Sequence, residues 1–228
     1  MKKNLVVVLS ILFLSFALIC GVQSPALAET TTTFSFASDT YHQGHTFKGE
    51  QNNIFSDSEI DLMVDLNSDT YGGLVTYHSR MQLTAQTGIY QVYAVGPQYL
   101  HVWKVSGEIV FTHINATTGN PPILTITFKE AVLTSWSPSP TTIGETMTLQ
   151  DSESADESIA MTAHTLLTGI GVKPEFLTQS EDFAFTFTHV RSASGGSPFA
   201  LIKVDKAGNL MEPWVAEGSF SASAYFPK

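Results

Sequence analysis

The stretch GGLVTYHSRMQLTA, residues 72–85, decides the fold class. After two glycines, apolar and polar side chains alternate at every second position. The apolar set is Val75, Tyr77, Met81, Leu83 and Ala85, and the polar set is Thr76, His78, Arg80, Gln82 and Thr84. A period of two residues is that of an extended strand, whose successive side chains point to opposite sides. One side of this strand is expected to be buried and the other to meet water.

The same alternation, interrupted by turn-forming residues, recurs along most of the chain. It predicts a short strand around Phe47 and further strands at residues 32–38, 60–67, 89–95, 98–105, 108–114, 123–128, 145–149, 158–165, 182–190, 199–204 and 214–226. Only residues 165–177 could hold a helix, and Gly169, Gly171 and Pro174 interrupt it. About a dozen strands of this kind predict an all-β fold, a two-sheet antiparallel β-sandwich or jelly roll.

The last predicted strand places unusually small side chains on one face. Ala216, Gly218 and Ala222 alternate there with Trp214 and Phe220. Small residues on a buried face leave room for large side chains opposite, so we expect this strand to pack against bulky neighbours.

The N-terminus has the pattern of a secretion signal. Lys2 and Lys3 precede an apolar run over residues 5–19, and Ala26-Leu27-Ala28 supplies the small residues that a signal peptidase accepts. Cleavage after Ala28 would leave residues 29–228 as one domain, secreted or periplasmic. An uncleaved anchor is the alternative, but the run is shorter than the ~20 residues that span a bilayer. Lipoprotein processing at Cys20 is another, although the bulky Ile19 fits it poorly.

Charge and cysteine content narrow the function classes. The net charge of the chain is −10, and loss of Lys2 and Lys3 with the signal makes it −12. A phosphate backbone attracts clustered Lys and Arg, so this balance argues against nucleic acid. Cys20 is the only cysteine, so the secreted portion would fold without disulfides. No second apolar stretch reaches membrane-spanning length.

One acidic turn is a candidate calcium site. Asp65, Asn67 and Asp69 recur at every second position before Gly72-Gly73, and calcium takes six to eight oxygen ligands that a bending loop can supply. The spacing departs from the helix-loop-helix calcium loop, because its glycine comes two residues late and Thr76 stands where a bidentate Glu is expected. The alternative is a solvated turn between two strands, where Asn and Asp are common. No other cofactor is indicated.

A predicted hairpin around Gly96-Pro97 carries the candidate ligand-binding residues. If both arms are regular, Tyr93, Tyr99, His101 and Trp103 lie on one face, while Tyr90, Val92, Leu100 and Val102 point the other way. Flat aromatic rings beside polar groups suit stacking against sugar rings. The alternative is that both faces are covered, since aromatic residues are ordinary in sandwich cores.

Motifs for catalysis are scarce. The chain has no Gly-x-Ser-x-Gly turn and no phosphate-binding glycine loop. Glu108, Glu130, Glu145 and Glu217 lie in or beside predicted strands, and a facing pair of such carboxylates could hydrolyse glycosides. Salt-bridged or solvent-facing carboxylates are the simpler interpretation. His42 and His45 form the closest histidine pair, but the flexible spacing fixes no metal geometry.

Three stretches, Phe34-Ser35-Phe36-Ala37-Ser38, Leu62-Met63-Val64-Asp65 and Ala216-Glu217-Gly218-Ser219-Phe220, carry a family resemblance. With them the chain resembles exported bacterial proteins of the PEP-CTERM type, which end in a Pro-Glu-Pro sorting segment. This chain ends in Ala224-Tyr225-Phe226-Pro227-Lys228 without such a segment. The resemblance implies export and no known activity, and the different ending disfavours anchoring by that route.

These observations favour a secreted or periplasmic, non-catalytic β-sandwich protein that binds a glycan or matrix component. Two alternatives remain open from the sequence. One is a carbohydrate-active enzyme on a jelly-roll scaffold, and the other is a structural surface protein that associates with copies of itself. Fold class alone does not choose between them.

Overall fold

The alternating segments become long antiparallel strands in the computed structural model, which describes residues 30–37, 47–67, 73–115, 117, 119–152, 159–172, 180–194 and 201–226. These residues belong to one compact unit that runs from Thr30 to Pro227. They form ten strands and one short helix: β1 (Thr30–Ala37), β2 (Phe47–Gln51), β3 (Asn53–Asn67), β4 (Gly73–Val95), β5 (Gln98–His113), β6 (Pro122–Ser137), β7 (Met147–Gln150), β8 (Ile159–Ala163), α2 (Thr165–Gly169), β9 (Ser180–Ser192) and β10 (Leu210–Phe226).

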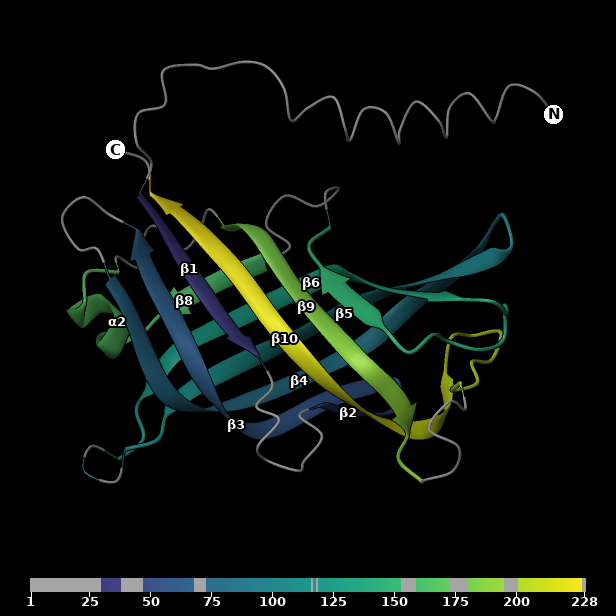
Figure 1. Cartoon of the computed structure of the whole chain (residues 1–228), viewed down its shortest axis with the longest axis horizontal. Coiled ribbons are helices and arrows are strands. Elements are labelled where there is room, and N and C mark those ends of the chain that lie inside the picture. Colours follow the sequence, from purple (N-terminus) through teal and green to yellow (C-terminus); the bar gives the residue numbers. More distant parts are fainter. Residues whose placement is uncertain are drawn as a thin grey trace, which may run out of the picture. The chain divides into compact units, whose positions relative to one another are not determined.

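The strands form a single hydrogen-bonded sheet that closes on itself. Its path runs β3–β4–β5–β6–β7–β9 and reaches β10, while β8 pairs with β6. β1 and β2 follow one another in the space between β10 and β3, since each of them pairs with both of those strands. The β4–β5–β6 side crosses behind the β1–β10–β9 side in Figure 1. The sheet thus encloses its own interior.

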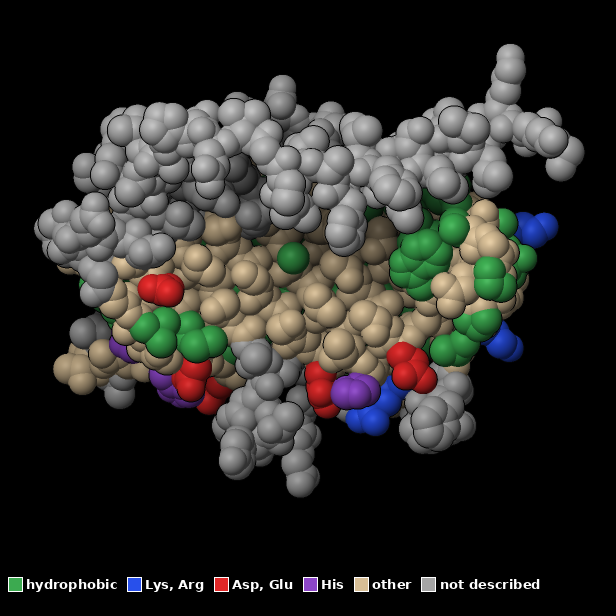
Figure 2. Space-filling model, turned by 45° about the horizontal axis from the view of Figure 1, so that its top comes forward, with side chains coloured by type: hydrophobic (Ala, Val, Ile, Leu, Met, Phe, Trp, Pro, Cys, Tyr) green, Lys and Arg blue, Asp and Glu red, His purple; other side chains and the backbone are tan. Residues whose placement is uncertain are grey.

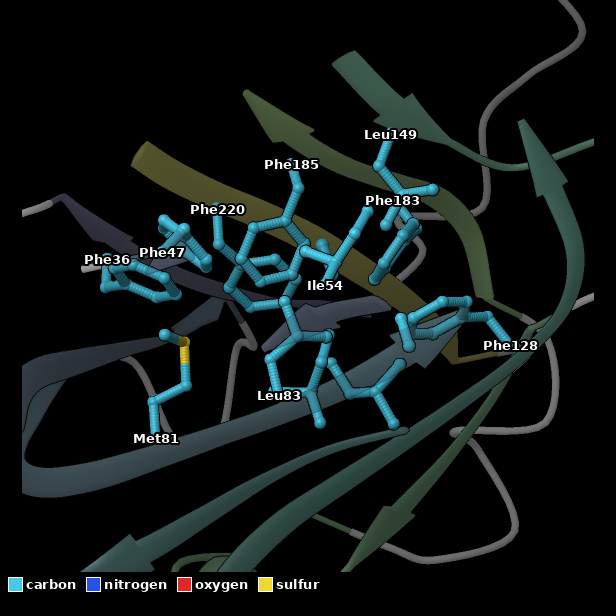
Figure 3. Close-up of a cluster of buried hydrophobic side chains, with 14 of the residues drawn as sticks. Phe36, Phe47, Ile54, Met81, Leu83, Phe128, Leu149, Phe183, Phe185 and Phe220 are labelled. Atoms are coloured by element: carbon cyan, nitrogen blue, oxygen red, sulfur yellow. The ribbon is translucent and has the colours of Figure 1, made fainter. Parts of the chain in front are cut away.

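Phenylalanine side chains from the two sides meet in that interior. Phe111 of β5 packs on Phe220 of β10 with ring centroids 5.7 Å apart, and Phe128 of β6 packs on Phe183 of β9 at 5.8 Å. Figure 3 shows Phe128, Phe183, Phe185 and Phe220 pointing toward a common centre. The predicted all-β, antiparallel, sandwich-like fold is confirmed, and its two layers are parts of one continuous sheet.

The strands are fewer and longer than the turn signals predict, because bulges replace several of the expected breaks. The segments 98–105 and 108–114 join into β5, and 123–128 extends to Ser137 as β6. Pairing passes from Val105–Ala131 to Gly107–Phe128, so two residues of β6 lie opposite one residue of β5 and the ladder continues. Glu130, in that bulge, has a φ of 55°. A bulge adds residues to one strand while pairing continues on either side of it.

The small residues of β10 make room for aromatic rings, as the sequence predicts. A Cβ added to Gly218 would lie 2.5 Å from a ring atom of Phe47. Gly49 of β2 likewise leaves space for Trp214, since a Cβ there would lie 2.0 Å from the indole. Both rings are buried, so these two glycines set how closely β2 and β10 approach.

Two weaker predictions change in extent. The helix expected over 165–177 is the single turn α2, which is followed by Gly171 with a φ of 101°, a conformation that favours glycine. Residues 173–177 lie outside the described residues. Of the strand expected over 199–204, Lys203 and Val204 form only isolated bridges with Thr142 and Leu210. Within the described ranges, no helix is long and apolar enough to cross a membrane.

Candidate functional site

The hairpin predicted at Gly96-Pro97 is present, but its β4 arm is not regular. Thr87 pairs with Val105 and Tyr90 pairs with Trp103, so Gly88 and Ile89 together occupy the place opposite one residue of β5. This bulge reverses the alternation in β4. Tyr90 therefore faces the same side as Trp103 instead of the opposite side.

Tyr90, His101 and Trp103 form a stack on the inner side of the hairpin, which we call the Tyr90 cluster. The ring centroids of Tyr90 and Trp103 are 5.0 Å apart, and those of His101 and Trp103 are 5.9 Å apart. His101 and Trp103 are buried, and Tyr90 is partly buried. The three rings thus extend the aromatic core to this end of the sheet.

The hydrogen bonds of His101 indicate which of its two ring nitrogens carries the proton. Its Nε2 lies 3.1 Å from the carbonyl oxygen of Ser139, which can only accept, so the proton is assigned to Nε2. The other ring nitrogen, Nδ1, accepts a 2.8 Å hydrogen bond from the hydroxyl of Tyr90. Burial lowers the pKa of His101, and the smaller effect of the Ser139 hydrogen bond opposes it. Burial also raises the pKa of Tyr90, with a further contribution from Asp205.

A turn over residues 205–209 covers this cluster. The indole N–H of Trp103 donates a 2.9 Å hydrogen bond to the carbonyl oxygen of Gly208. Gly208 has a φ of 88°, and a Cβ there would lie 2.4 Å from Cβ of Tyr90. Asp205 holds the turn by accepting from the backbone N–H groups of Ala207 and Asn209 at 2.8 and 2.9 Å. Its hydrogen bonds, first that to the Asn209 side chain, lower the pKa of Asp205.

The structure therefore divides the predicted ligand-binding set. His101 and Trp103 are buried in the core, and Tyr99 lies on the same inner side, half-buried. Tyr93 alone points outward, 47% exposed. The expectation that all four share one face is wrong for Tyr93. Residues 90–95 pair regularly with β5, and the Val95–Gln98 pair across the two-residue turn sets Tyr93 opposite Leu100, on the other side from Tyr99, His101 and Trp103. His101 and Trp103 carry structural contacts instead of an open binding surface.

Tyr93 has exposed apolar neighbours on the outer side of the sheet. It pairs with Leu100 of β5, and Leu100 pairs with Trp136 of β6. Trp136 is 48% exposed, and Leu100 is half-buried between the two aromatic rings. We call these three residues the Tyr93–Trp136 patch. Paired residues of neighbouring strands point to the same side, so the patch is a straight row across three strands.

Two uncharged polar side chains, Gln91 and Thr134, border this patch. Gln91, Val102 and Thr134 form the adjacent cross-strand row, and the Tyr93 hydroxyl donates a hydrogen bond to Oε1 of Gln91. Figure 2 shows hydrophobic side chains gathered at the right-hand end of the face it presents, with Lys or Arg side chains at the rim of that end. The patch combines flat apolar rings with hydrogen-bonding groups.

Trp136 was not among the candidates from the sequence, because the predicted strand stopped at residue 128. The missed signal is the alternation that resumes after the bulge. Leu133, Ser135 and Ser137 are buried while Val132, Thr134 and Trp136 face outward. Recognising that alternation would have placed Trp136 on an outer face, but not next to Leu100.

The acidic turn lies largely outside the described residues. Asp65 is exposed near the end of β3. The backbone of Asn67 pairs with Thr31, but its side chain and the whole of Asp69 fall outside the description. Within the described ranges, no three His, Cys, Asp or Glu side chains gather as metal ligands. The calcium site remains a prediction.

The charged groups that the structure describes lie mainly on outer surfaces. Arg80 forms a bidentate ion pair with Asp57. Its hydrogen bonds lower the pKa of the Asp57 carboxyl. Glu108 on β5 is exposed, and Glu217 on β10 contacts His189 at 3.2 Å. Because β5 and β10 lie in opposite layers and both carboxylates point outward, these two do not form a facing pair.

Comparison of the chain with protein-family models, with curated proteins and with solved structures finds no match. The candidate site therefore rests on the geometry described above.

Proposed function

We propose that the protein acts outside the cytoplasm as a non-catalytic binding protein, and that the Tyr93–Trp136 patch holds a glycan or a glycan-bearing matrix component. The signal-like N-terminus supports export. The observation that carries the binding proposal is the alignment of two half-exposed aromatic side chains on either side of Leu100.

The spacing of the row suits an extended chain of sugar rings. Tyr93 and Trp136 are separated by two strand spacings, about 10 Å. One oligosaccharide lying across the strands would contact both rings. Sugar rings offer apolar C–H faces to aromatic side chains, and their hydroxyls would bond to Gln91 and Thr134 in the neighbouring row.

Charge favours a neutral or weakly charged glycan. No Asp, Glu, Lys or Arg occurs in the two rows that form the patch and its border, since their members are Gln91, Tyr93, Leu100, Val102, Thr134 and Trp136. A highly anionic polymer would find no cation in these rows and would be repelled by a chain of net charge −10.

A glycan-array screen, followed by calorimetric titration of the strongest ligand, tests the proposal. Trp136→Ala and Tyr93→Ala should each weaken binding about tenfold, on the order of the 1–3 kcal/mol that a ring stacked on an aromatic side chain contributes in other complexes. Both side chains are half-exposed, so the melting temperature should change little.

Met211→Ala is the matched control, since Met211 is a 65% exposed apolar residue on β10. Its affinity should equal that of the wild type. A ligand whose affinity is unaffected by Trp136→Ala and Tyr93→Ala binds elsewhere, and the proposed site is then wrong. A second screen in the presence of a chelator shows whether binding needs calcium.

A further inference from the structure

The end of β4 is a strand edge with no partner among the described residues. β3 pairs with β4 only as far as Asn53–Gln86, and the backbone N–H of Thr87 then donates to the carbonyl oxygen of Asn52 at 2.8 Å. From residue 88 to residue 95, β4 pairs with β5 alone. In an antiparallel pair the N–H and C=O groups of alternate residues point away from the partner strand, so alternate residues of this segment direct these groups away from β5.

This edge is exposed and apolar. Ile89, Val92, Tyr93 and Val95 are 70%, 40%, 47% and 45% exposed. Residues 88–98 read GIYQVYAVGPQ and contain no charged side chain. Proteins usually protect exposed edges with charges, prolines or short strands. Here the bulge at Gly88-Ile89 interrupts the beginning of the edge, while residues 90–95 pair regularly with β5.

We propose that this edge, residues 89–95 of β4, is the interface of a twofold dimer in which two copies of the chain pair their β4 strands antiparallel. An isologous contact brings the same residues of both copies together, and β-strand addition satisfies the free N–H and C=O groups of both edges.

A second copy fits because the edge is complementary to itself. Antiparallel pairing centred on Val92 places Val92 against Val92, Gln91 against Tyr93 and Ile89 against Val95 of the partner copy. Val92, Ile89 and Val95 then have apolar neighbours, Tyr93 lies against the uncharged amide of Gln91, and cross-strand apolar pairs stabilise sheets. Outward residues meet outward residues in this register, so the two Tyr93–Trp136 patches would join into one continuous surface.

The absence of charge on residues 89–95 also favours this edge as the dimer interface. The chain carries 21 acidic and 11 basic residues, so most encounters between copies are repulsive. On the neighbouring β3–β4 surface, for example, Asp57, Asp61 and Arg80 are exposed. The uncharged edge brings no like charges face to face.

Sedimentation velocity of the full chain tests the interface. The wild type should show a concentration-dependent dimer, and Val92→Lys should sediment as a monomer with an unchanged circular dichroism spectrum, because burying two lysines against each other is unfavourable. A wild type that stays monomeric over its whole soluble range, or a Val92→Lys variant that still dimerises, overturns the proposal.

Disulfide trapping tests the register. In a Cys20→Ser background, Val92→Cys should oxidise to a covalent dimer, since the twofold axis places residue 92 within disulfide distance of its copy. Met211→Cys, an exposed position on β10, should remain monomeric. Equal cross-linking of the two variants contradicts the register. Val92→Lys keeps Tyr93 and Trp136, so loss of the dimer with retained affinity for an isolated oligosaccharide separates this proposal from the proposed function.

Discussion

The hydroxyl of Tyr90 donates a 2.8 Å hydrogen bond to Nδ1 of the buried His101. The same imidazole places its Nε2 at 3.1 Å from the carbonyl oxygen of Ser139. Both ring nitrogens are thus paired only while the ring is neutral, because a proton on Nδ1 would leave the Tyr90 hydroxyl no acceptor there. Protonation would disturb the contact between the hairpin and the segments that cover it.

The stability of the protein should fall on mild acidification because of His101. Burial lowers its pKa in the folded state, so the unfolded chain binds the proton at higher pH. The neutral His101 ring contributes fully to folding stability at pH values above the ordinary histidine pKa of about 6.5. That contribution is lost as the pH falls below this value. Urea unfolding at several pH values between about 8 and about 5 should therefore show decreasing free energy of unfolding.

His101→Gln is the control for this effect, since its amide has both a donor and an acceptor but does not titrate. The variant should show a smaller loss of stability over that range. Asp57 and Asp205 do not interfere, because their pKa values are lowered from 3.8 and their contributions are lost only at more acidic pH. An unchanged pH dependence in His101→Gln would assign the effect to other groups.

Removing the buried hydroxyls of Thr32 and Ser79 should have different effects on the free energy of unfolding. The Thr32 hydroxyl is buried, and no hydrogen-bond partner for it occurs among the described residues. Thr32→Val should leave the free energy of unfolding unchanged or raise it by about 1 kcal/mol. Ser79 is equally buried but donates a 2.8 Å hydrogen bond to the carbonyl oxygen of Tyr77, so Ser79→Ala should cost about 1 kcal/mol. Urea titration of both variants measures the difference, and equal losses would contradict it.

Gly218→Val should be strongly destabilising. The added Cβ would lie 2.5 Å from the Phe47 ring and 2.9 Å from the carbonyl oxygen of Thr186, so the sheet must shift. Overpacking of this kind costs about 1–3 kcal/mol, measurable as a lower melting temperature. Ser219→Val, at the next and exposed position of β10, should change stability little. A loss at Gly218 no greater than that at Ser219 would show that the Phe47 contact is not limiting.

Removal of calcium should lower the melting temperature if the acidic turn binds the ion. Ligands that bind only the folded state stabilise it by mass action, so adding a chelator should remove that stabilisation. Asp65→Ala should make the protein insensitive to the chelator, because it removes one of the predicted oxygen ligands. Identical melting of the wild type with and without chelator, together with a silent Asp65→Ala, would remove the calcium prediction.

Local side-chain alternation was sufficient to predict most of the strands and which of their faces are buried. It did not predict the strand residues 53–59 of β3 and 129–137 of β6, and the strand expected over 199–204 is reduced to isolated bridges. Residues 75–85 and the inward face of β10 follow the pattern directly. The bulges were not predictable, because an extra residue at Gly88-Ile89 or near Glu130 depends on how the neighbouring strand pairs. The sequence therefore predicts the wrong side for Tyr90, and a strand predicted to end at residue 128 does not include Trp136.

By itself the sequence determined that this chain forms antiparallel strands, since a polar–apolar period of two residues suits only segments whose backbone groups pair with neighbours. It also determined that the small residues of β10 would face bulky rings. Tertiary structure alone decided which strands pair. It brought Tyr93, Leu100 and Trp136 into one row, and it buried Trp103 beneath the 205–209 turn and His101 beside Ser139. Pairing register joins residues distant in the chain, and no local periodicity contains that information.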